Sequence, residues 1–410
     1  MGWGTLMAYL FVPDMLVGRA AEFVQLANAR LASLISAPEV KDSDRVFAFP
    51  LIDVLRAFAA ISVVVYHVIE FFEWKSYPVT GFLLWFRIGW MGVDLFFVIS
   101  GFVIGLSAFR RLDRRGPRQA RAEFVRHRLA RIVPLHYLTC LFFVAFITPA
   151  IMFSNGFWAQ IVSHALFVHN LIPEHHRAIN NVNWTLGVEM QFYLLIFIGV
   201  VWLRRAKPWL ILALGLSITW IWRSVAFAHI PANDPVGVDA LFMAVTQLPG
   251  MLDEFTFGLL LARIVVAPRG QRLLAAIAPY AWIVVAMAGL VVWAILTVFW
   301  MAPAYWTSWK MVVLFRTLIG VGAAACVLAT ITIRSRILLL LTAPVRYLGT
   351  ISYGIYLWHL LVILSLHRVP GMTPQLALPV VLAMTFVLAA VSWHYFERPI
   401  LRRYAHAVPK

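Results

Sequence analysis

Charged residues are scarce in this 410-residue chain, where they make up only 13% of the sequence, about half the share that is usual in a soluble domain. Acidic residues are the scarcer sign, with 18 against 34 lysines and arginines. Apolar residues fill 62% of the chain, and a soluble core of that composition would leave large apolar patches facing water. The composition therefore excludes an ordinary soluble domain and indicates an integral membrane protein.

Several other features are missing as well. The two cysteines, Cys140 and Cys326, both lie in apolar runs, so no disulfide framework is expected. The sequence has no G-x-S-x-G nucleophile elbow and no Walker loop. No set of cysteines, histidines and carboxylates completes a metal site, and the basic clusters are not interleaved with exposed aromatic residues. We therefore expect neither a bound metal nor a nucleic-acid partner.

Apolar runs of about 20 residues, the length that crosses the hydrocarbon core as a helix, recur along the chain. Ten are recognisable, at about 52–72, 87–108, 130–151, 186–204, 208–229, 249–267, 279–300, 310–333, 347–367 and 376–396. A shorter and more polar stretch from Trp158 to Ile172 is expected to be a surface or re-entrant helix. The sequence thus predicts an all-α, polytopic helical bundle with about ten transmembrane helices.

The ends of the chain differ from this membrane region. Residues 1–46 carry apolar positions at helical spacing among scattered charges, a pattern typical of an interfacial amphipathic helix. We expect an N-terminal cytoplasmic or interfacial extension over 1–46, a membrane domain over 47–400 and a cytoplasmic tail over 401–410.

The lysines and arginines alternate between the two sides of the predicted spans. One side, which includes the run from Arg110 to Arg131, collects 26 of them, the other side five, and three lie within spans. Positive residues gather on the cytoplasmic side of membrane proteins. We therefore expect both termini in the cytoplasm and a multi-pass protein of the cell inner membrane, with the lipid bilayer as its partner.

Ionisable side chains at membrane depth are costly and are functional candidates for that reason. Arg56 and His67 lie eleven residues apart in the first span, which puts them on one helix face about 16 Å apart. With the N-terminus inside, Arg56 is near the cytoplasmic surface and His67 is in the outer half. Snorkelling to lipid phosphate is the alternative for Arg56, and a hydrogen-bonded packing role is the alternative for His67.

Three further groups are predicted at the depth of His67, namely Asp94, Glu189 and His359. A histidine beside a carboxylate is the minimum needed to activate a hydroxyl by general-base catalysis. On the cytoplasmic side, Arg128 and Arg131 are three residues apart on one helix face. Two guanidinium groups at that spacing suit a phosphate, although anchoring at the cytoplasmic surface is the simpler interpretation.

Taken together, these motifs resemble the acyltransferase-3 family of integral-membrane O-acyltransferases. The resemblance covers residues 48–400 and rests on Arg56-x10-His67, on the R-x-x-R pair of Arg128 and Arg131, and on segments in the right order. These segments are Ile52–Ala60, Gly92–Phe102, Arg128–Pro134, Trp184–Tyr193, Ile351–His359 and Glu397–Pro399. The chain resembles members that lack a fused hydrolase-like domain.

The resemblance implies a cytosolic acyl-CoA donor, most often acetyl-CoA, and a hydroxyl acceptor on a cell-envelope or exported glycan or glycolipid. It places Arg128 and Arg131, together with Arg56, at the phosphates of the donor. His67 then acts as general base or accepts the acyl group itself, and Glu189 orients its imidazole as the acid of a triad does. Asp94 and His359 are expected to bind the acceptor.

A different class of protein is also compatible with these features. Ten spans with buried Arg, His, Asp and Glu also describe a proton-coupled transporter or a glycan flippase. Such transporters commonly show repeat symmetry between their halves, and the sequence shows no internal repeat. A membrane receptor or an assembly scaffold is a third interpretation, for which no motif speaks.

Overall fold

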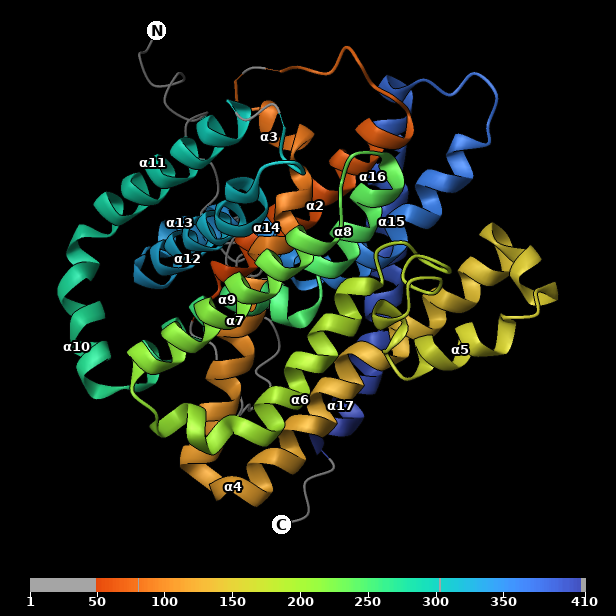
Figure 1. Ribbon diagram of the computed structural model, residues 1–410. Coiled ribbons are helices and arrows are strands. Elements are labelled where there is room, and N and C mark those ends of the chain that lie inside the picture. Colours follow the sequence, from red (N-terminus) through yellow and green to blue (C-terminus); the bar gives the residue numbers. More distant parts are fainter. Residues whose placement is uncertain (1–48, 80, 302–303, 407–410) are drawn as a thin grey trace, which may run out of the picture. The chain divides into compact units, whose positions relative to one another are not determined.

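The structure is a computed structural model that describes residues 49–79, 81–301 and 304–406 (Figure 1). The predicted extension over 1–46 and the last residues of the predicted tail lie outside this part of the chain. Within the described residues every regular element is a helix and no strand occurs. The predicted all-α class is therefore confirmed.

The helices follow one another with short connections, and several begin with a proline in the first turn, where a missing N–H is harmless. The α-helices are α2 (Ile52–Phe71), α3 (Leu84–Arg87), α4 (Gly92–Phe142), α5 (Phe157–Ala165), α6 (Trp184–Arg205), α7 (Pro208–His229), α8 (Pro235–Val245), α9 (Leu248–Val266), α10 (Pro268–Ile277), α11 (Ala281–Trp300), α12 (Arg316–Thr332), α13 (Arg336–Leu341), α14 (Ala343–Thr350), α15 (Ser352–His367), α16 (Pro374–Ser392) and α17 (Arg398–His406). The 3₁₀ segments are η1 (Gly89–Met91), η3 (Pro149–Phe153), η4 (His169–Leu171) and η5 (Ala278–Tyr280), and the π-helical segments are η2 (Phe143–Ile147), η6 (Lys310–Phe315) and η7 (Trp393–Glu397).

Seven helices of the described chain are long and apolar enough to cross a membrane, or eight if the bent pair of α14 and α15 is one span. This number is lower than the expected ten for two reasons. Two of the expected spans, 87–108 and 130–151, overlap the two ends of the single helical stretch Gly89–Ile147, which counts once. The expected span at 249–267 is α9, which carries Asp253, Glu254 and Arg263 and so is more polar than an ordinary span.

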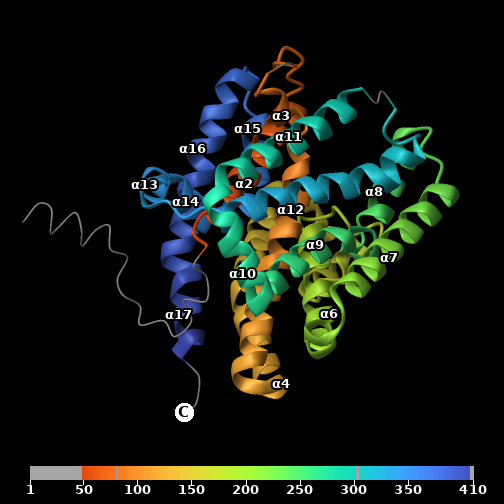
Figure 2. The same cartoon turned by 90° about the vertical axis from the view of Figure 1, so that its left-hand side faces the viewer.

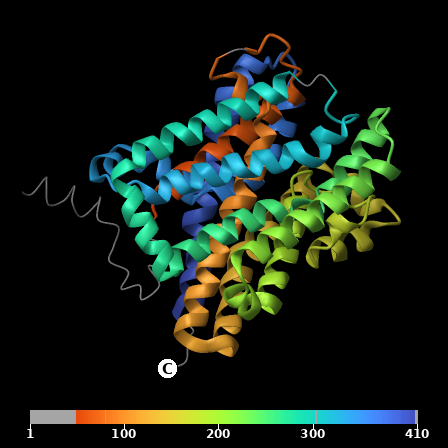
Figure 3. The ribbon, with the colours of Figure 1, turned by 60° about the vertical axis from the view of Figure 1, so that its left-hand side comes forward.

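Helix α4 is a hairpin of two arms rather than one straight rod. Its 51 residues would span about 75 Å as a continuous helix, far more than a bilayer. The chain leaves helical geometry at Gly116, where φ is 73°, a conformation that favours glycine. Arg111 and Arg115, before this turn, form ion pairs with Glu123, after it, at 3.3 and 3.1 Å. Figure 3 shows the two arms turning back on one another at the base of α4.

The centre of the bundle is built where α4 meets α9. A side chain at Gly101 would collide with the backbone carbonyl of Phe255, and one at Gly258 with that of Val98, so both glycines permit the two backbones to approach closely. The ring of Phe255 stacks on Phe192 of α6, with centroids 4.1 Å apart. Helix α12 packs on both α4 and α9, and α11 packs on α12. Figure 2 shows α11 and α12 facing the viewer.

The bent pair of helices α14 and α15, near the C-terminus, brings His359 next to α2. Helices α14 and α15 meet at an angle of 71°, and Gly349 of α14 packs against the backbone of Asp53 in α2. As a result α15, which carries His359, runs beside α2, which carries His67. The fold therefore brings together residues that are 292 positions apart in the sequence.

Candidate active site

Two neighbouring cavities lie within the bundle. The first, here called the arginine cavity, has a volume of about 150 Å³ and is lined by Arg56, Arg128, Arg131, Glu189 and Tyr193 among others. The second, here called the histidine cavity, has a volume of about 400 Å³ and is lined by His67, Glu70, Trp90, Arg177 and Arg316 among others. The structure thus separates the predicted arginines from the predicted histidine, as their spacing along α2 implies.

His67 is held by a second histidine. Nε2 of His359 lies 3.0 Å from Nδ1 of His67, and Nδ1 of His359 lies 2.7 Å from the backbone carbonyl oxygen of Tyr356. His359 is completely buried, whereas His67 reaches the histidine cavity. His359 was expected to bind the acceptor; the structure places it in contact with His67 and not among the residues that line the histidine cavity.

This arrangement fixes which nitrogen of His67 is basic. A carbonyl oxygen only accepts hydrogen bonds, so Nδ1 of a neutral His359 carries the proton and its Nε2 is an acceptor. Nδ1 of His67 then donates to His359, which leaves the lone pair on Nε2 of His67. Among the described residues the ring of His67 also interacts with the backbone carbonyl of Val63, one helical turn earlier. No described side chain is hydrogen-bonded to its Nε2, which is the nitrogen left for a ligand in the histidine cavity.

The arginine cavity gathers the three arginines that the sequence predicted. Nη1 of Arg131 lies 3.5 Å from Oε2 of Glu397, and its Nη2 donates to the carbonyl of Thr350 at 3.3 Å. The guanidinium of Arg131 also lies 4.9 Å from the ring centroid of Trp393. Arg56 pairs with Asp53 at 3.5 Å. These contacts hold cationic groups at one wall of an enclosed space, an arrangement suited to phosphate.

Glu189 belongs to the arginine cavity. Its Oε1 accepts hydrogen bonds from Ser100 at 3.2 Å and from Tyr193 at 2.9 Å. The guanidinium of Arg128 in turn lies over the ring of Tyr193, 5.8 Å from the centroid of that ring. The expected pairing of Glu189 with His67 is not found among the described residues, because His359 takes that position.

A thin wall separates the two cavities. Val93 and Tyr356 line both of them. The hydroxyl of Tyr356 donates to the carbonyl of Val182 at 3.2 Å and accepts from Thr185 at 3.1 Å. A group bound in the arginine cavity is therefore separated from His67 by side chains alone.

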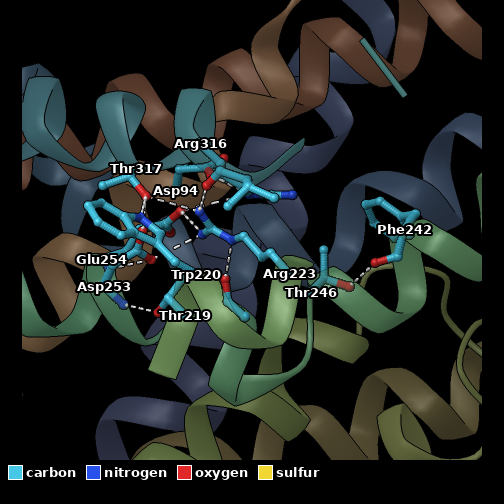
Figure 4. A network of polar contacts seen from close by, with 12 residues as sticks. Asp94, Thr219, Trp220, Arg223, Phe242, Thr246, Asp253, Glu254, Arg316 and Thr317 are labelled. Carbon is cyan, nitrogen blue, oxygen red and sulfur yellow. Dashed lines mark hydrogen bonds and ion pairs between the residues drawn. The ribbon is translucent and has the colours of Figure 1, made fainter. Parts of the chain in front are cut away.

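Asp94 was expected to contact an acceptor, but it lies deeper than the cavities. It is fully buried, and its Oδ1 accepts a hydrogen bond from Nε of Arg316 at 2.8 Å. Figure 4 shows this pair within a network that also contains Arg223, Asp253 and Glu254. Arg316, unlike Asp94, lines the histidine cavity.

Sequence reasoning did not assign a function to Arg316 or Tyr356. Arg316 is an arginine within a predicted span, and the rule that drew attention to His67 applies to it equally. Tyr356 gave no comparable signal, because an aromatic residue in an apolar helix is usually part of the core.

The polar stretch between α4 and α6 forms a cap of histidines outside the spans. The rings of His164 and His169 stack with centroids 4.2 Å apart. Burial, together with the nearby imidazole of His169, lowers the pKa of His164 to about 3. Burial and the charge of Arg177 lower the pKa of His176 to about 4. Within the described residues no group of three or more His, Cys, Asp or Glu side chains could hold a metal ion.

Comparison with known proteins assigns the chain to a family. The acyltransferase domain family matches residues 49–394, which include every helix that lines the two cavities. The chain belongs to this family of acyltransferase domains. It is a multi-pass membrane protein, in agreement with the apolar helices of the structure.

Three curated relatives that the chain resembles are named as O-acetyltransferases. The chain is 26% identical over 377 residues to the peptidoglycan O-acetyltransferase OatA of Listeria monocytogenes, which is 86% of this chain and 55% of that protein. It is 26% identical over 392 residues to the putative peptidoglycan O-acetyltransferase YrhL of Bacillus subtilis, covering 86% of this chain and 54% of the relative. It is 24% identical over 383 residues to the O-acetyltransferase OatA of Staphylococcus aureus, covering 86% of this chain and 57% of the relative. The chain thus spans about half the length of the curated relatives it matches. No solved structure matches it significantly.

Proposed function

We propose that this protein is a membrane-bound O-acyltransferase that moves an acyl group, most simply acetyl, from cytosolic acyl-CoA to a hydroxyl of a cell-envelope or exported glycan. The observation that carries the proposal is the free Nε2 of His67, which faces a cavity next to a second cavity lined by three arginines. A base and a phosphate-binding wall are the two parts that such a reaction needs from the protein.

In this proposal the acceptor hydroxyl binds in the histidine cavity. Nε2 of His67 removes its proton as the oxygen attacks the acyl carbonyl, and the thiolate of CoA leaves. The imidazolium formed on His67 is stabilised through its Nδ1–H bond to His359. The proton on Nε2 then passes to the thiolate, so no net proton is released.

The donor binds in the arginine cavity. Arg56, Arg128 and Arg131 contact the phosphates of acyl-CoA, and the acyl end reaches toward the wall formed by Val93 and Tyr356. Glu189 offsets one of the three positive charges of the arginines. With the arginines facing the cytoplasm, the protein lies in the cell inner membrane and its acceptor approaches from the outer side.

The acceptor is a glycan in the relatives whose names state one, which are called peptidoglycan O-acetyltransferases. Peptidoglycan is therefore the first acceptor to test for this chain. A glycolipid or another exported polysaccharide as acceptor is an outcome of the test.

The experiment supplies acetyl-CoA, labelled in the acetyl group, to membranes that contain wild-type protein or His67→Ala at matched levels. We expect the label to enter lipid-linked or polymeric glycan only with the wild type, and free CoA to appear in step with it. Succinyl-CoA and longer acyl-CoA are tested alongside to establish the acyl group. Equal labelling by the two proteins would contradict the proposal.

A further inference from the structure

Arg316 is a buried guanidinium with unused hydrogen-bond donors at the wall of the histidine cavity. The residue is 3% exposed, and its Nε donates to Asp94 at 2.8 Å. No described residue accepts a hydrogen bond from its Nη1 or Nη2, although the side chain lines the cavity that also holds His67. The Nη1 and Nη2 atoms are not among the enclosed side-chain nitrogens without a partner, so they open to the cavity, where a ligand can accept their hydrogen bonds.

The surrounding network supports Arg316. Oδ1 of Asp94 lies 2.8 Å and Oε1 of Glu254 lies 3.8 Å from its Nε. The guanidinium also lies over the ring of Trp90, 5.6 Å from its centroid. Such support orients a guanidinium in advance, which lowers the entropy lost when a ligand binds.

Charge balance in the network leaves Arg316 able to attract an anion. Arg223 pairs with Asp253 at 3.1 Å, and Arg316 pairs with Asp94. Glu254 is a third carboxyl group between the two pairs, and neither of its oxygens has a hydrogen-bond partner among the described donors. A proton on Glu254 makes the network of Figure 4 neutral, and the cationic member of the Arg316–Asp94 pair lines the cavity.

We infer that Arg316 is the anchor of an anion subsite in the histidine cavity, and that the acceptor carries a carboxylate or a phosphate near the hydroxyl that is acylated. This inference rests on the proposed function for the role of the cavity, and it narrows the acceptor to an anionic glycan. Planar guanidinium donors bind both groups in a bidentate manner. The aromatic rings of Trp90, Trp184 and Tyr305 form apolar walls of the same cavity.

The test measures binding, so that it does not depend on acyl transfer. Dissociation constants are measured on the purified full-length chain for D-glucuronate and its methyl ester, and for glucose 6-phosphate and glucose. The wild type is expected to bind at least one anion about tenfold more tightly than its uncharged counterpart. The two pairs distinguish a carboxylate from a phosphate as the preferred group.

The decisive variant is the double substitution Arg316→Gln/Asp94→Asn, which removes both charges of the pair and leaves no buried charge unpaired. We expect it to bind each acid no more tightly than the matching neutral compound. The matched control is Arg223→Gln/Asp253→Asn, which alters the neighbouring pair of the same network. Because Arg223 and Asp253 are fully buried and line neither cavity, the control is expected to keep the wild-type preference.

Two results would overturn the inference. The first is equal affinity of the wild-type chain for all charged and uncharged probes. The second is a preference for anions that survives in Arg316→Gln/Asp94→Asn. Equal CoA release by the wild type and His67→Ala would instead refute the proposed function. The binding data would still decide whether the anion subsite exists.

Discussion

Nε2 of His359 lies 3.0 Å from Nδ1 of His67, and this contact determines how the candidate base works. In a serine-protease triad a carboxylate fixes the tautomer of the histidine. Here a neutral imidazole does so, because its own Nδ1 proton is committed to the carbonyl of Tyr356. The base therefore needs no carboxylate as its partner.

Substitution of His359 tests this relationship. His359→Ala removes the acceptor for Nδ1–H of His67, so the ring is free to rotate and to change tautomer. We expect CoA release to fall on the order of a hundredfold, with an unchanged KM for acyl-CoA. His359→Gln places an amide oxygen near the same position and is expected to recover part of the rate. Similar rates for His359→Ala and the wild type would rule out the positioning role.

Arg131 is expected to bind the donor. Arg131→Gln removes a charged group from the arginine cavity, so the KM for acyl-CoA should rise about tenfold or more, while the rate at saturating donor changes less. Steady-state kinetics with acetyl-CoA measure both quantities. Arg118→Gln, at an exposed arginine near the turn of α4, is the matched control and should leave the KM as it is. An equal effect of both substitutions would indicate general surface attraction instead of a site.

Glu189 distinguishes two accounts of the site. If it served as the acid of a triad, Glu189→Gln would lower the rate and shift the pH profile of the base. Its position among the arginines predicts a different result, because removal of a negative charge favours a polyanionic donor. We expect the KM for acyl-CoA to fall a few-fold, with the pH profile unchanged. The kinetic pH profile of this variant decides between them.

The histidine cap predicts lower stability in acid. Burial lowers the pKa of His164 from its ordinary 6.5 to about 3. Between these values the unfolded chain binds a proton that the folded chain does not, so the free energy of unfolding falls as the pH falls. At pH 5 the loss from this residue is about 2 kcal/mol relative to neutral pH.

Thermal unfolding of the purified chain at several pH values measures this effect. His164→Gln should weaken the dependence of the unfolding temperature on pH between neutral pH and pH 5. His229→Gln, at an exposed histidine outside the cap, should leave this dependence as steep as in the wild type. A wild-type chain equally stable at pH 5 and pH 7.5 would contradict the prediction.

The helical class and the separation of Arg56 from His67 were predictable, because helix periodicity and apolar length are local properties of a sequence. The partner of His67 was not. His359 and Glu189 were both placed in the outer half of the membrane, and depth alone does not tell which of two helices faces a third. Helices α14 and α15 are bent by 71° relative to one another and both pack on α2, and this packing is not visible in the sequence.

The arginines show the same limit on prediction. Their spacing indicated one helix face for Arg128 and Arg131, whereas Arg56 was grouped with them only through the family resemblance, and the structure places all three at one cavity. Asp94 was assigned to the acceptor because it is ionisable and deep. Its ion pair with Arg316 joins residues 222 positions apart, and such a contact follows from the packing of α4 on α12 rather than from any local pattern.

The role of His67 is decided by the rate of CoA release from acetyl-CoA in membranes that hold equal amounts of wild-type or His67→Ala protein. We expect His67→Ala to lower this rate by a factor on the order of 10² to 10⁴, because the general base is lost. Equal rates for the two proteins in the presence of glycan acceptors would contradict it and would favour a transporter or flippase.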